Sequence, residues 1–374
     1  MEFRDLKKQY QVLKPEIDAA VIDVMTKGSF IGGNIVTELE EQLADYVGVK
    51  HCISCANGTD ALQLALLAWG IGKGDAVFVP DFTFFSSGEV VSAVGATPVF
   101  VDITERTFNL STDSLATAIE RVIKESNLRP RVIIAVDLFG QPAEHGKIRE
   151  IANKYGLLVL EDAAQAFGGS INGKRTCGFG DIGTTSFFPA KPLGCYGDGG
   201  AVFTDSDEWD SLIRSYKVHG KGQDKYDNIR IGMNSRLDTI QAAILEVKLK
   251  HFIDHEFIEV NEAANIYANN LRNKVMCPLI IDGYESSWAQ FTILLNSEAQ
   301  RNDVHAKLKE NGIPSMVYYS KGLSNQKAFQ NKSIFYDVSN SNSISKRCLS
   351  LPMGPYIDVI DLNLVSEIIK TVIW

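Results

Sequence analysis

One lysine of this sequence follows an apolar strand pattern and precedes a glycine-rich turn. Residues 184–191 read TTSFFPAK, and the chain continues PLGCYGDGG as far as residue 200. A lysine among apolar neighbours loses hydration of its charged form, so its pKa falls and its amine suits Schiff-base chemistry. An isolated loop lysine is usually a surface residue. Phe187, Phe188 and the glycines around Lys191 favour the reactive interpretation.

A carboxylate and a helix start accompany this lysine. The run LLVLED places Asp162 at the end of an apolar strand, where open α/β sheets bind ligands. Taken alone, Asp162 fits a turn or a helix cap better. The segment ANGTDAL at 56–62 predicts a strand and then a helix N-terminus, whose free N–H groups attract phosphate, although a plain N-cap is the simpler local explanation.

These three segments together supply what pyridoxal 5′-phosphate (PLP) requires. Lys191 is a covalent anchor, Asp162 can keep a pyridine nitrogen protonated, and the segment at 56–62 can receive a phosphate. The combination therefore predicts a PLP site, although none of the three segments would do so alone.

The elements that must position these residues alternate between strand patterns and helical patterns. Near-continuous apolar strands separated by amphipathic helices predict an α/β fold with a mostly parallel seven-stranded sheet, covered on both faces. The seven strands are expected at His51–Cys55, Ala76–Val79, Pro98–Ile103, Val132–Phe139, Leu157–Leu160, Thr184–Phe188 and Ala201–Thr204. The helices between the first five are expected at Asp60–Trp69, Ser86–Val94, Thr112–Lys124 and His145–Tyr155.

The pattern changes after residue 205. We predict a large domain over residues 1–250 and a small C-terminal α/β domain over 251–374, and the first 30 or so residues could pack with either. The expected later elements are helices at 207–219, 236–250 and 256–272, a strand at Gln290–Leu295, and helices at Ala299–Asn311 and 361–373.

Composition narrows the classes of function. The 374 residues are 45% hydrophobic and 22% charged, with a formal net charge of -9, so broad nucleic-acid binding is disfavoured. The charged N-terminus and the short apolar stretch Leu62–Ile71 indicate neither a secretory signal nor a membrane span. Six scattered cysteines do not resemble a disulfide framework. We therefore expect a cytoplasmic protein with reduced thiols.

Four motif matches are better explained without function. The CxxC at Cys52–Cys55 lies inside a strand pattern and lacks a second pair, and the histidines of His251–His255 lack the glutamate of zinc proteases. The GxGxxG at 178–183 precedes a strand instead of opening a helix, and Arg175 replaces the Ser/Thr of a P-loop. We expect no metal site.

Jointly, the motifs resemble the DegT/DnrJ/EryC1/StrS family of sugar aminotransferases. The matching segments are NGTDALQLAL, EDAAQAFG, SFFPAKPLGCYGDGGA, HG at 219–220 and GMNSRLDTIQAAIL, and the resemblance runs from DLKKQY near the start to LSLPM at 349–353. It implies a PLP-dependent transferase of fold type I that forms a homodimer with active sites at the subunit interface. Family dehydratases replace the lysine with histidine, and a non-catalytic sugar-nucleotide regulator would have lost Lys191 or Asp162. Both residues are present.

The resemblance also implies roles for individual positions. Lys191 would carry PLP and later move a proton, Asp162 would pair with the pyridine nitrogen, and Gln165 would contact the ring hydroxyl. Phe84 would stack on the ring. The phosphate would be held by Gly58, Thr59, Ser186 and, from the other subunit, Asn234.

The substrates implied by the resemblance are L-glutamate and a nucleotide-linked keto sugar. CISCANGTDAL and TSFFPAKPLGCYGDGGA are similar to segments of members that aminate UDP-2-acetamido-2-deoxy-3-oxo-glucuronate, for surface polysaccharide such as O-antigen. A dTDP- or UDP-linked 3-oxo- or 4-oxo-6-deoxy sugar is the alternative. Arg236, at the expected start of a helix, is our candidate for the uronate carboxylate, because guanidinium binds carboxylate bidentately. Structural packing explains Arg236 equally well.

Three departures from the family pattern fall outside the cofactor residues. Tyr318 and Ser320 stand where many members have histidine and proline, and Gly354 follows LSLPM where a histidine is common. We expect Tyr318 and Tyr319 to contact the substrate, so these departures bear on which substrate is bound.

Overall fold

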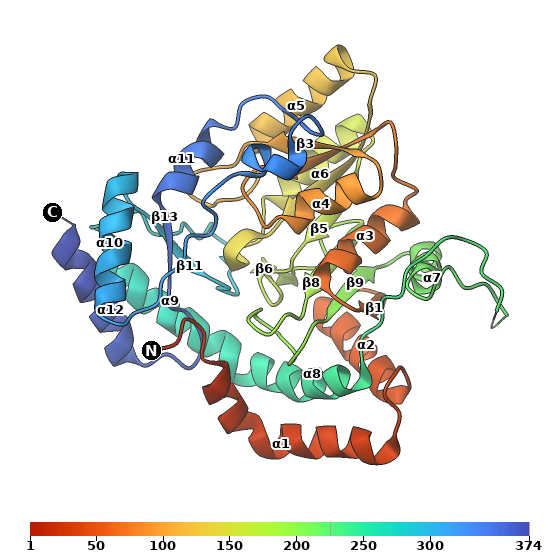
Figure 1. Cartoon of the computed structure of the whole chain (residues 1–374), viewed down its shortest axis with the longest axis horizontal. Coiled ribbons are helices and arrows are strands. Elements are labelled where there is room, and N and C mark those ends of the chain that lie inside the picture. The colour runs from red at the N-terminus through yellow and green to blue at the C-terminus, as the bar shows by residue number, and fades with distance from the viewer. Residues whose placement is uncertain (225, 374) are drawn as a thin grey trace.

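A twisted eight-stranded sheet forms the centre of the molecule, seen in a computed structural model that describes residues 1–224 and 226–373 (Figure 1). Its strand order is β1-β9-β8-β5-β4-β2-β3-β12, and only β9 runs antiparallel to its neighbours. The bounds are β1 His51–Cys55, β2 Asp75–Pro80, β3 Thr97–Val101, β4 Arg129–Val136, β5 Leu158–Asp162, β8 Ile182–Ser186, β9 Gly200–Thr204 and β12 Ile334–Phe335. The predicted mostly parallel α/β sheet is confirmed.

The eighth strand, β12, was not predicted. It comes from the C-terminal part of the chain and pairs in parallel with β3 through two residues, Ile334 and Phe335. Two apolar residues carry no periodicity, so this pairing is visible only in the folded chain.

Helices cover both faces of the sheet. Along β2, Val77 packs with the α3 and α4 side, whereas Phe78 packs with the α5 and α6 side, as the alternation of a strand requires. α7 adds to the first side, and α2 and α8 add to the second. The bounds are α2 Asn34–Val47, α3 Gly58–Ala68, α4 Ser86–Ala93, α5 Thr112–Glu125, α6 His145–Tyr155, α7 Asp207–Tyr216 and α8 Thr239–His251.

The C-terminal part contains a separate two-stranded sheet packed against helices. β11 pairs with β13, and their apolar residues share one core with α9, α10 and α12. The bounds are α9 Phe257–Leu271, β11 Phe291–Leu294, α10 Glu298–Glu310, α11 Ser339–Arg347, β13 Cys348–Leu351 and α12 Val359–Val372. A small three-stranded sheet elsewhere joins β6 Ser170–Ile171, β7 Lys174–Arg175 and β10 Tyr284–Glu285.

A continuous helical run crosses the predicted domain boundary. α8 passes through one π-helical turn at Phe252–Glu256 directly into α9. The division at residue 250 therefore falls inside this run, and we retain it as a proposal. The first helix, α1 (Leu6–Lys27), packs on α8, while the carbonyl oxygen of Phe3 accepts a hydrogen bond of 3.0 Å from the Met353 N–H.

One predicted helix start is wrong. We expected a helix over 236–250 with Arg236 at its start, but α8 begins at Thr239. The preceding residues are extended because Asp238 bridges to Ile31 and the Thr239 N–H donates to the Phe30 carbonyl oxygen. None of the helices in the described ranges combines the length and apolar character that a membrane crossing requires.

Candidate active site

Lys191 lies in the loop that follows β8. Its N–H donates to the Phe188 carbonyl oxygen at 2.8 Å, which closes a tight turn. The turn is held by the Lys248 amine, which donates to the Gly194 carbonyl oxygen. Burial lowers the pKa of Lys191 to about 8, Asp162 opposes this effect, and Arg4 adds to it. Much of Lys191 is therefore a neutral amine, and thus a nucleophile, at pH values near 8.

Asp162 lies at the carboxyl end of β5, as predicted, and is buried. The Ser87 hydroxyl donates to one carboxylate oxygen at 2.8 Å, and the Ala164 N–H donates to the other at 3.2 Å. Burial raises the pKa of Asp162, whereas these hydrogen bonds and the Lys191 charge lower it. The carboxylate is thus oriented, and a cationic ring nitrogen would stabilise its charged form.

The N-terminus of α3 packs closely on the end of β8. A Cβ atom added to Gly58 would lie 2.7 Å from Ser186 Cβ, so only glycine allows this approach. Asn57 caps α3 by accepting a hydrogen bond of 2.8 Å from the Asp60 N–H. The structure thereby brings Gly58, Thr59 and Ser186 to one helix N-terminus, an arrangement that suits a phosphate.

Gln165 connects the sheet edge to the aromatic side chains nearby. Its side-chain oxygen accepts a hydrogen bond of 2.9 Å from the Phe139 N–H, and its side-chain nitrogen donates to the Tyr319 hydroxyl at 3.0 Å. The ring of Phe84 lies 6.4 Å from the ring of Tyr319 and is half exposed, so one of its surfaces remains available. Tyr318 packs beside Tyr319, with ring centroids 5.6 Å apart.

Asn234 and Arg236 are not joined to this set within one chain. Both are exposed, and neither makes a described hydrogen bond or ion pair with the residues around Lys191. Ser235 between them is buried and accepts a hydrogen bond of 3.0 Å from the Ala56 N–H. The segment that follows α7 stands away from the body of the molecule in Figure 1.

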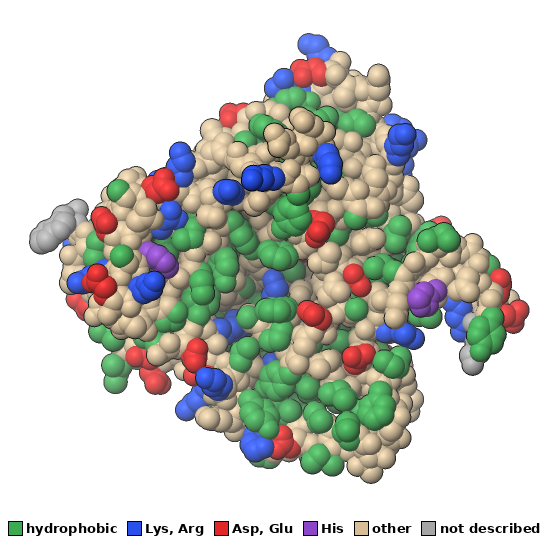
Figure 2. Space-filling view, viewed as in Figure 1, with side chains coloured by type: hydrophobic (Ala, Val, Ile, Leu, Met, Phe, Trp, Pro, Cys, Tyr) green, Lys and Arg blue, Asp and Glu red, His purple; other side chains and the backbone are tan. Residues whose placement is uncertain are grey.

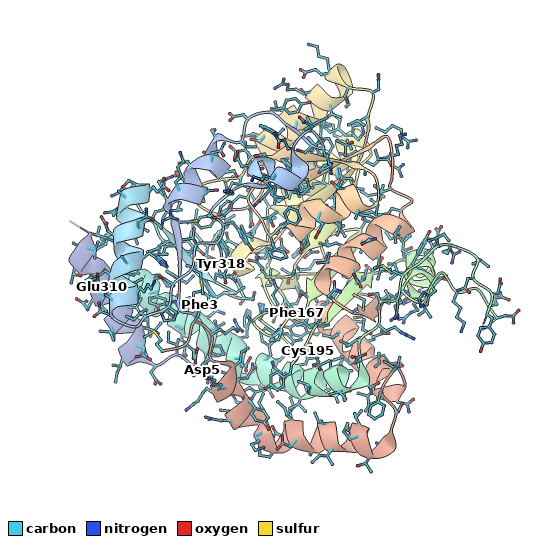
Figure 3. The ribbon with its side chains drawn as sticks, in the orientation of Figure 1. Phe3, Asp5, Phe167, Cys195, Glu310 and Tyr318 are labelled. Carbon is cyan, nitrogen blue, oxygen red and sulfur yellow. The ribbon has the colours of Figure 1, made fainter. Side chains whose placement is uncertain are left out.

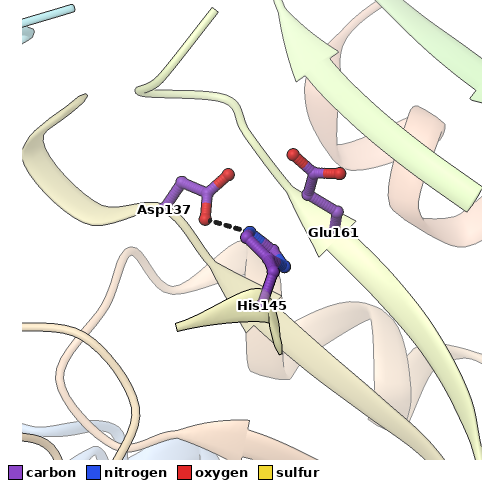
Figure 4. Close-up of side chains that lie close together, drawn as sticks. All are labelled: Asp137, His145 and Glu161. Atoms are coloured by element: carbon purple, nitrogen blue, oxygen red, sulfur yellow. Dashed lines mark hydrogen bonds and ion pairs between the residues drawn. The ribbon is translucent and has the colours of Figure 1, made fainter. Parts of the chain in front are cut away.

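Asp137, His145 and Glu161 form a buried cluster (Figure 4), and Glu161 directly precedes Asp162 in the chain. The nearest nitrogen of His145 is 2.7 Å from an oxygen of Asp137, and Glu161 accepts hydrogen bonds from the Phe179 and Gly180 N–H groups. Burial raises the pKa of Asp137 to about 8 and that of Glu161 to about 7.

This cluster has the donor types of a metal site, but protein groups already engage several of its ligand atoms. Its contact with the site is through the backbone, because the Asp137 N–H donates to the Asp162 carbonyl oxygen at 3.0 Å. Sequence reasoning missed the cluster because its members come from β5, α6 and the residue after β4.

Ser87 and Arg4 were also missed. The sequence near Ser87 gives one indication that this residue belongs to the site, because Ser87 lies in the first turn of a helix that follows strand β2. The sequence near Arg4 gives no indication of a role in the site, because its neighbour in space, Pro192, is far along the chain.

These residues fit PLP as a group. A buried amine of lowered pKa, an oriented carboxylate, a glycine-lined helix N-terminus and a half-exposed aromatic ring lie on neighbouring segments. Each matches one part of the cofactor: the aldehyde, the pyridine nitrogen, the phosphate and the face of the ring.

Known proteins resemble the whole chain. The model of the DegT/DnrJ/EryC1/StrS aminotransferase family matches residues 11–370. UDP-2-acetamido-2-deoxy-3-oxo-D-glucuronate aminotransferase from Pseudomonas aeruginosa is 44% identical over 98% of both chains. A crystal structure of a DegT DnrJ EryC1 StrS aminotransferase from Brucella abortus is 45% identical, with a TM-score of 0.96 over 99% of both chains. The Bacillus subtilis protein NtdA with bound cofactor PMP is 29% identical, with a TM-score of 0.88 over 96% of this chain and 82% of that one.

Proposed function

Because this chain belongs to the DegT/DnrJ/EryC1/StrS aminotransferase family, we propose that it moves an amino group from L-glutamate to a nucleotide-linked keto sugar, with PLP as its cofactor. The sugar that we favour is UDP-2-acetamido-2-deoxy-3-oxo-glucuronate, because the Pseudomonas relative is named for it. The product would serve surface polysaccharide synthesis. We place the reaction in the cytoplasm, where the six cysteines would stay reduced.

PLP, when bound, supplies an electrophilic carbon and an electron sink. Lys191 would hold it covalently, Asp162 would keep its ring nitrogen protonated, and Phe84 would cover one face of its ring. Gly58, Thr59 and Ser186 would hold the phosphate at the start of α3. These residue roles are proposals that rest on the positions of the side chains.

Lys191 has a second task once a substrate amine has taken its place. Its free amine would accept a proton from the substrate carbon and return it elsewhere, which requires a pKa near the working pH. The lowered pKa, about 8, meets that requirement. Asp162 would not take over this task, because its carboxylate would be engaged by the protonated ring nitrogen.

The active unit that we propose is a homodimer. Asn234 would reach the phosphate in the site of the partner subunit, and Arg236 would bind the carboxylate of the sugar there. The exposure of both side chains supports this arrangement, and Ile229 and Ile231, at 58% and 93% exposure, lie close to them in the sequence and would gain from burial at an interface.

The position of the Lys191 amine beside Asp162 carries this proposal. Product analysis tests it: purified enzyme is incubated with L-glutamate and a panel of nucleotide keto sugars. We expect 2-oxoglutarate and an aminated uronate in equal amounts. An aminated 4-oxo-6-deoxy sugar would overturn the choice of sugar and leave amino transfer standing. No amine on any sugar would overturn the function.

A further inference from the structure

Arg4 lies beside the active-site loop, and the reaction proposed above does not use it. Its Nη2 is 3.4 Å from the carbonyl oxygen of Pro192, the residue after Lys191. Its Nη1 is shielded from solvent and has no hydrogen-bond partner in the described parts of the chain. Burial lowers the pKa of Arg4, but a guanidinium stays charged at neutral pH. A positive charge with an unused donor therefore lies next to Lys191.

The N-terminal segment holds Arg4 at both sides. The Phe3 carbonyl oxygen accepts a hydrogen bond of 3.0 Å from the Met353 N–H, and Asp5 caps α1 by accepting one of 2.8 Å from the Lys8 N–H. The Phe3 ring packs edge-on against Tyr318, with centroids 6.2 Å apart (Figure 3). The position of Arg4 is thus set by packing, unlike that of an ordinary surface arginine.

Arg4 is not ion-paired with any carboxylate of the described residues. The charge of Glu256 still reaches it and raises its pKa. Glu256 is instead engaged by Gln9 at 2.7 Å and Tyr356 at 2.6 Å. A desolvated, unpaired guanidinium is unfavourable, and a carboxylate is the ligand that fits its planar fork.

The stem of Arg4 packs near Gly354, where an added Cβ atom would lie 3.6 Å from Arg4 Cγ. Figure 2 shows Lys and Arg side chains inside the recess between the α1 and α8 region and the strand–helix body above it. On the Gly354 side the hollow beside Arg4 is lined by Glu2, Asp5, Asp358 and Asp361, so an anion would have to approach the guanidinium from the Lys191 side.

We propose that Arg4 binds a carboxylate of a substrate next to Lys191, which rests on the function proposed above. Two substrates carry such a group: L-glutamate and the 3-oxo uronate, which would occupy the site in turn. The recognition chemistry is the same for both, so the experiment must separate them. In the dimer proposed above, Arg236 of the partner subunit would approach the same uronate, so the two arginines would share that carboxylate, whereas Arg4 alone belongs to the chain that carries Lys191.

Binding of unreactive ligands to the PLP-loaded enzyme tests the proposal. UDP-glucuronate and UDP-glucose differ only in a carboxylate, and glutarate stands for the carboxylates of glutamate. Calorimetric titration would compare wild type with Arg4→Gln, which keeps the length of the stem, and with Arg4→Lys. Lys7→Ala is the matched control, because it removes one positive charge from the same segment at an exposed position.

We expect wild type to bind UDP-glucuronate about tenfold more tightly than UDP-glucose, and Arg4→Gln to reduce that preference to about threefold, because Arg236 of the partner subunit remains, while it keeps its affinity for UDP-glucose. Alternatively, Arg4→Gln lowers the affinity for glutarate about tenfold and leaves the affinities for the two UDP sugars unchanged. That result would assign Arg4 to glutamate. Arg4→Lys should retain part of either preference, and Lys7→Ala all of it.

The inference is overturned if Arg4→Gln matches wild type within twofold in both arms, or if wild type prefers neither carboxylate ligand. Cofactor absorbance and UDP-glucose affinity report whether each variant is folded. Should Arg4→Gln fail to fold, the same comparison is made with Arg4→Lys. Amino transfer by wild type is measured in parallel, so failure of the proposed function is seen separately.

Discussion

The proposed site has two parts. The residues of the first, Lys191 and Asp162, are held in place by their own chain, whereas those of the second, Asn234 and Arg236, are not. Asp162 ends β5 and Lys191 lies in the loop after β8, and hydrogen bonds from their own chain fix the carboxylate and the lysine turn. Asn234 and Arg236 are exposed and make no described hydrogen bond or ion pair with the residues around Lys191, although Ser235 between them is buried. We infer that the sheet alone positions the chemistry of the cofactor, whereas a second subunit completes phosphate binding and substrate selection.

The largest loss of activity should come from Lys191→Ala, which changes the part of the site that its own chain holds in place. Without the amine, the enzyme should lose all turnover and the yellow absorption of covalently held PLP. Absorbance spectra and product analysis would show this. A Lys191→Ala protein that still transfers amine at the normal rate would refute the assignment.

Asp162→Asn should slow the glutamate half-reaction roughly hundredfold or more while the protein still binds PLP, because an amide stabilises a protonated pyridine far less than a carboxylate does. Single-turnover absorbance measures the rate. Ser87→Ala should show a smaller loss, since it removes only the 2.8 Å hydrogen bond that orients Asp162. An unimpaired Asp162→Asn half-reaction would argue against an electrostatic role.

If the site is shared, an inactive Asn234 variant and an inactive Lys191 variant should restore activity to each other in mixed dimers. Asn234→Ala should weaken PLP binding roughly tenfold or more, since it removes a hydrogen bond to a charged phosphate. Mixed with Lys191→Ala under conditions that exchange subunits, it should recover about a quarter of wild-type activity: half of the dimers are mixed, and each has one complete site. No recovery despite exchange, or an active monomer in light scattering, would contradict a shared site.

The pH dependence of cofactor capture tests the environment of Lys191. Protonated lysine cannot attack the aldehyde, so the capture rate should rise with pH and level off above about 8, a change of about tenfold between pH 7 and pH 9. Stopped-flow absorbance on cofactor-free enzyme measures it. Because the charge of Arg4 lowers the pKa of Lys191, Arg4→Gln should move this profile to higher pH. An unchanged profile would mean that the two charges do not interact.

Arg236→Lys should have one of the smallest effects, about 1.5 kcal/mol in kcat/KM on the uronate, which is the low end for a hydrogen bond to a charged group. A 4-oxo-6-deoxy sugar, which has no carboxylate, is the control substrate and should show no change. Equal losses on both sugars would indicate a packing role for Arg236.

Much of the fold could be predicted because each central strand is apolar on both faces. The runs around Val132 and Leu160 are buried between helices, so composition alone marks them as strands. The start of α8 could not be predicted in the same way. Pairing of Asp238 with Ile31 keeps the preceding residues extended, and such a long-range contact leaves no periodicity in the sequence.

The residues of the candidate site also differ in whether local sequence patterns predict them. Lys191 and Asp162 follow apolar strands, so their convergence at one sheet edge could be predicted. Arg4 and Ser87 could not be found, because their contacts with Pro192 and Asp162 join segments that are distant in sequence. The roles of Asn234 and Arg236 depend on a second chain and remain predictions.

The hydrogen bond between Phe3 and Met353 has a consequence for the order of synthesis. Arg4 leaves the ribosome among the first residues, yet the backbone that anchors its neighbour is made near the end. Chains are extended at about 5–20 residues per second, and early segments can fold during that time. A nascent chain that ends soon after β9 would contain Lys191, Asp162 and the start of α3, with Arg4 still unanchored. The contact that we assign to substrate is therefore completed only after Met353 has been synthesised.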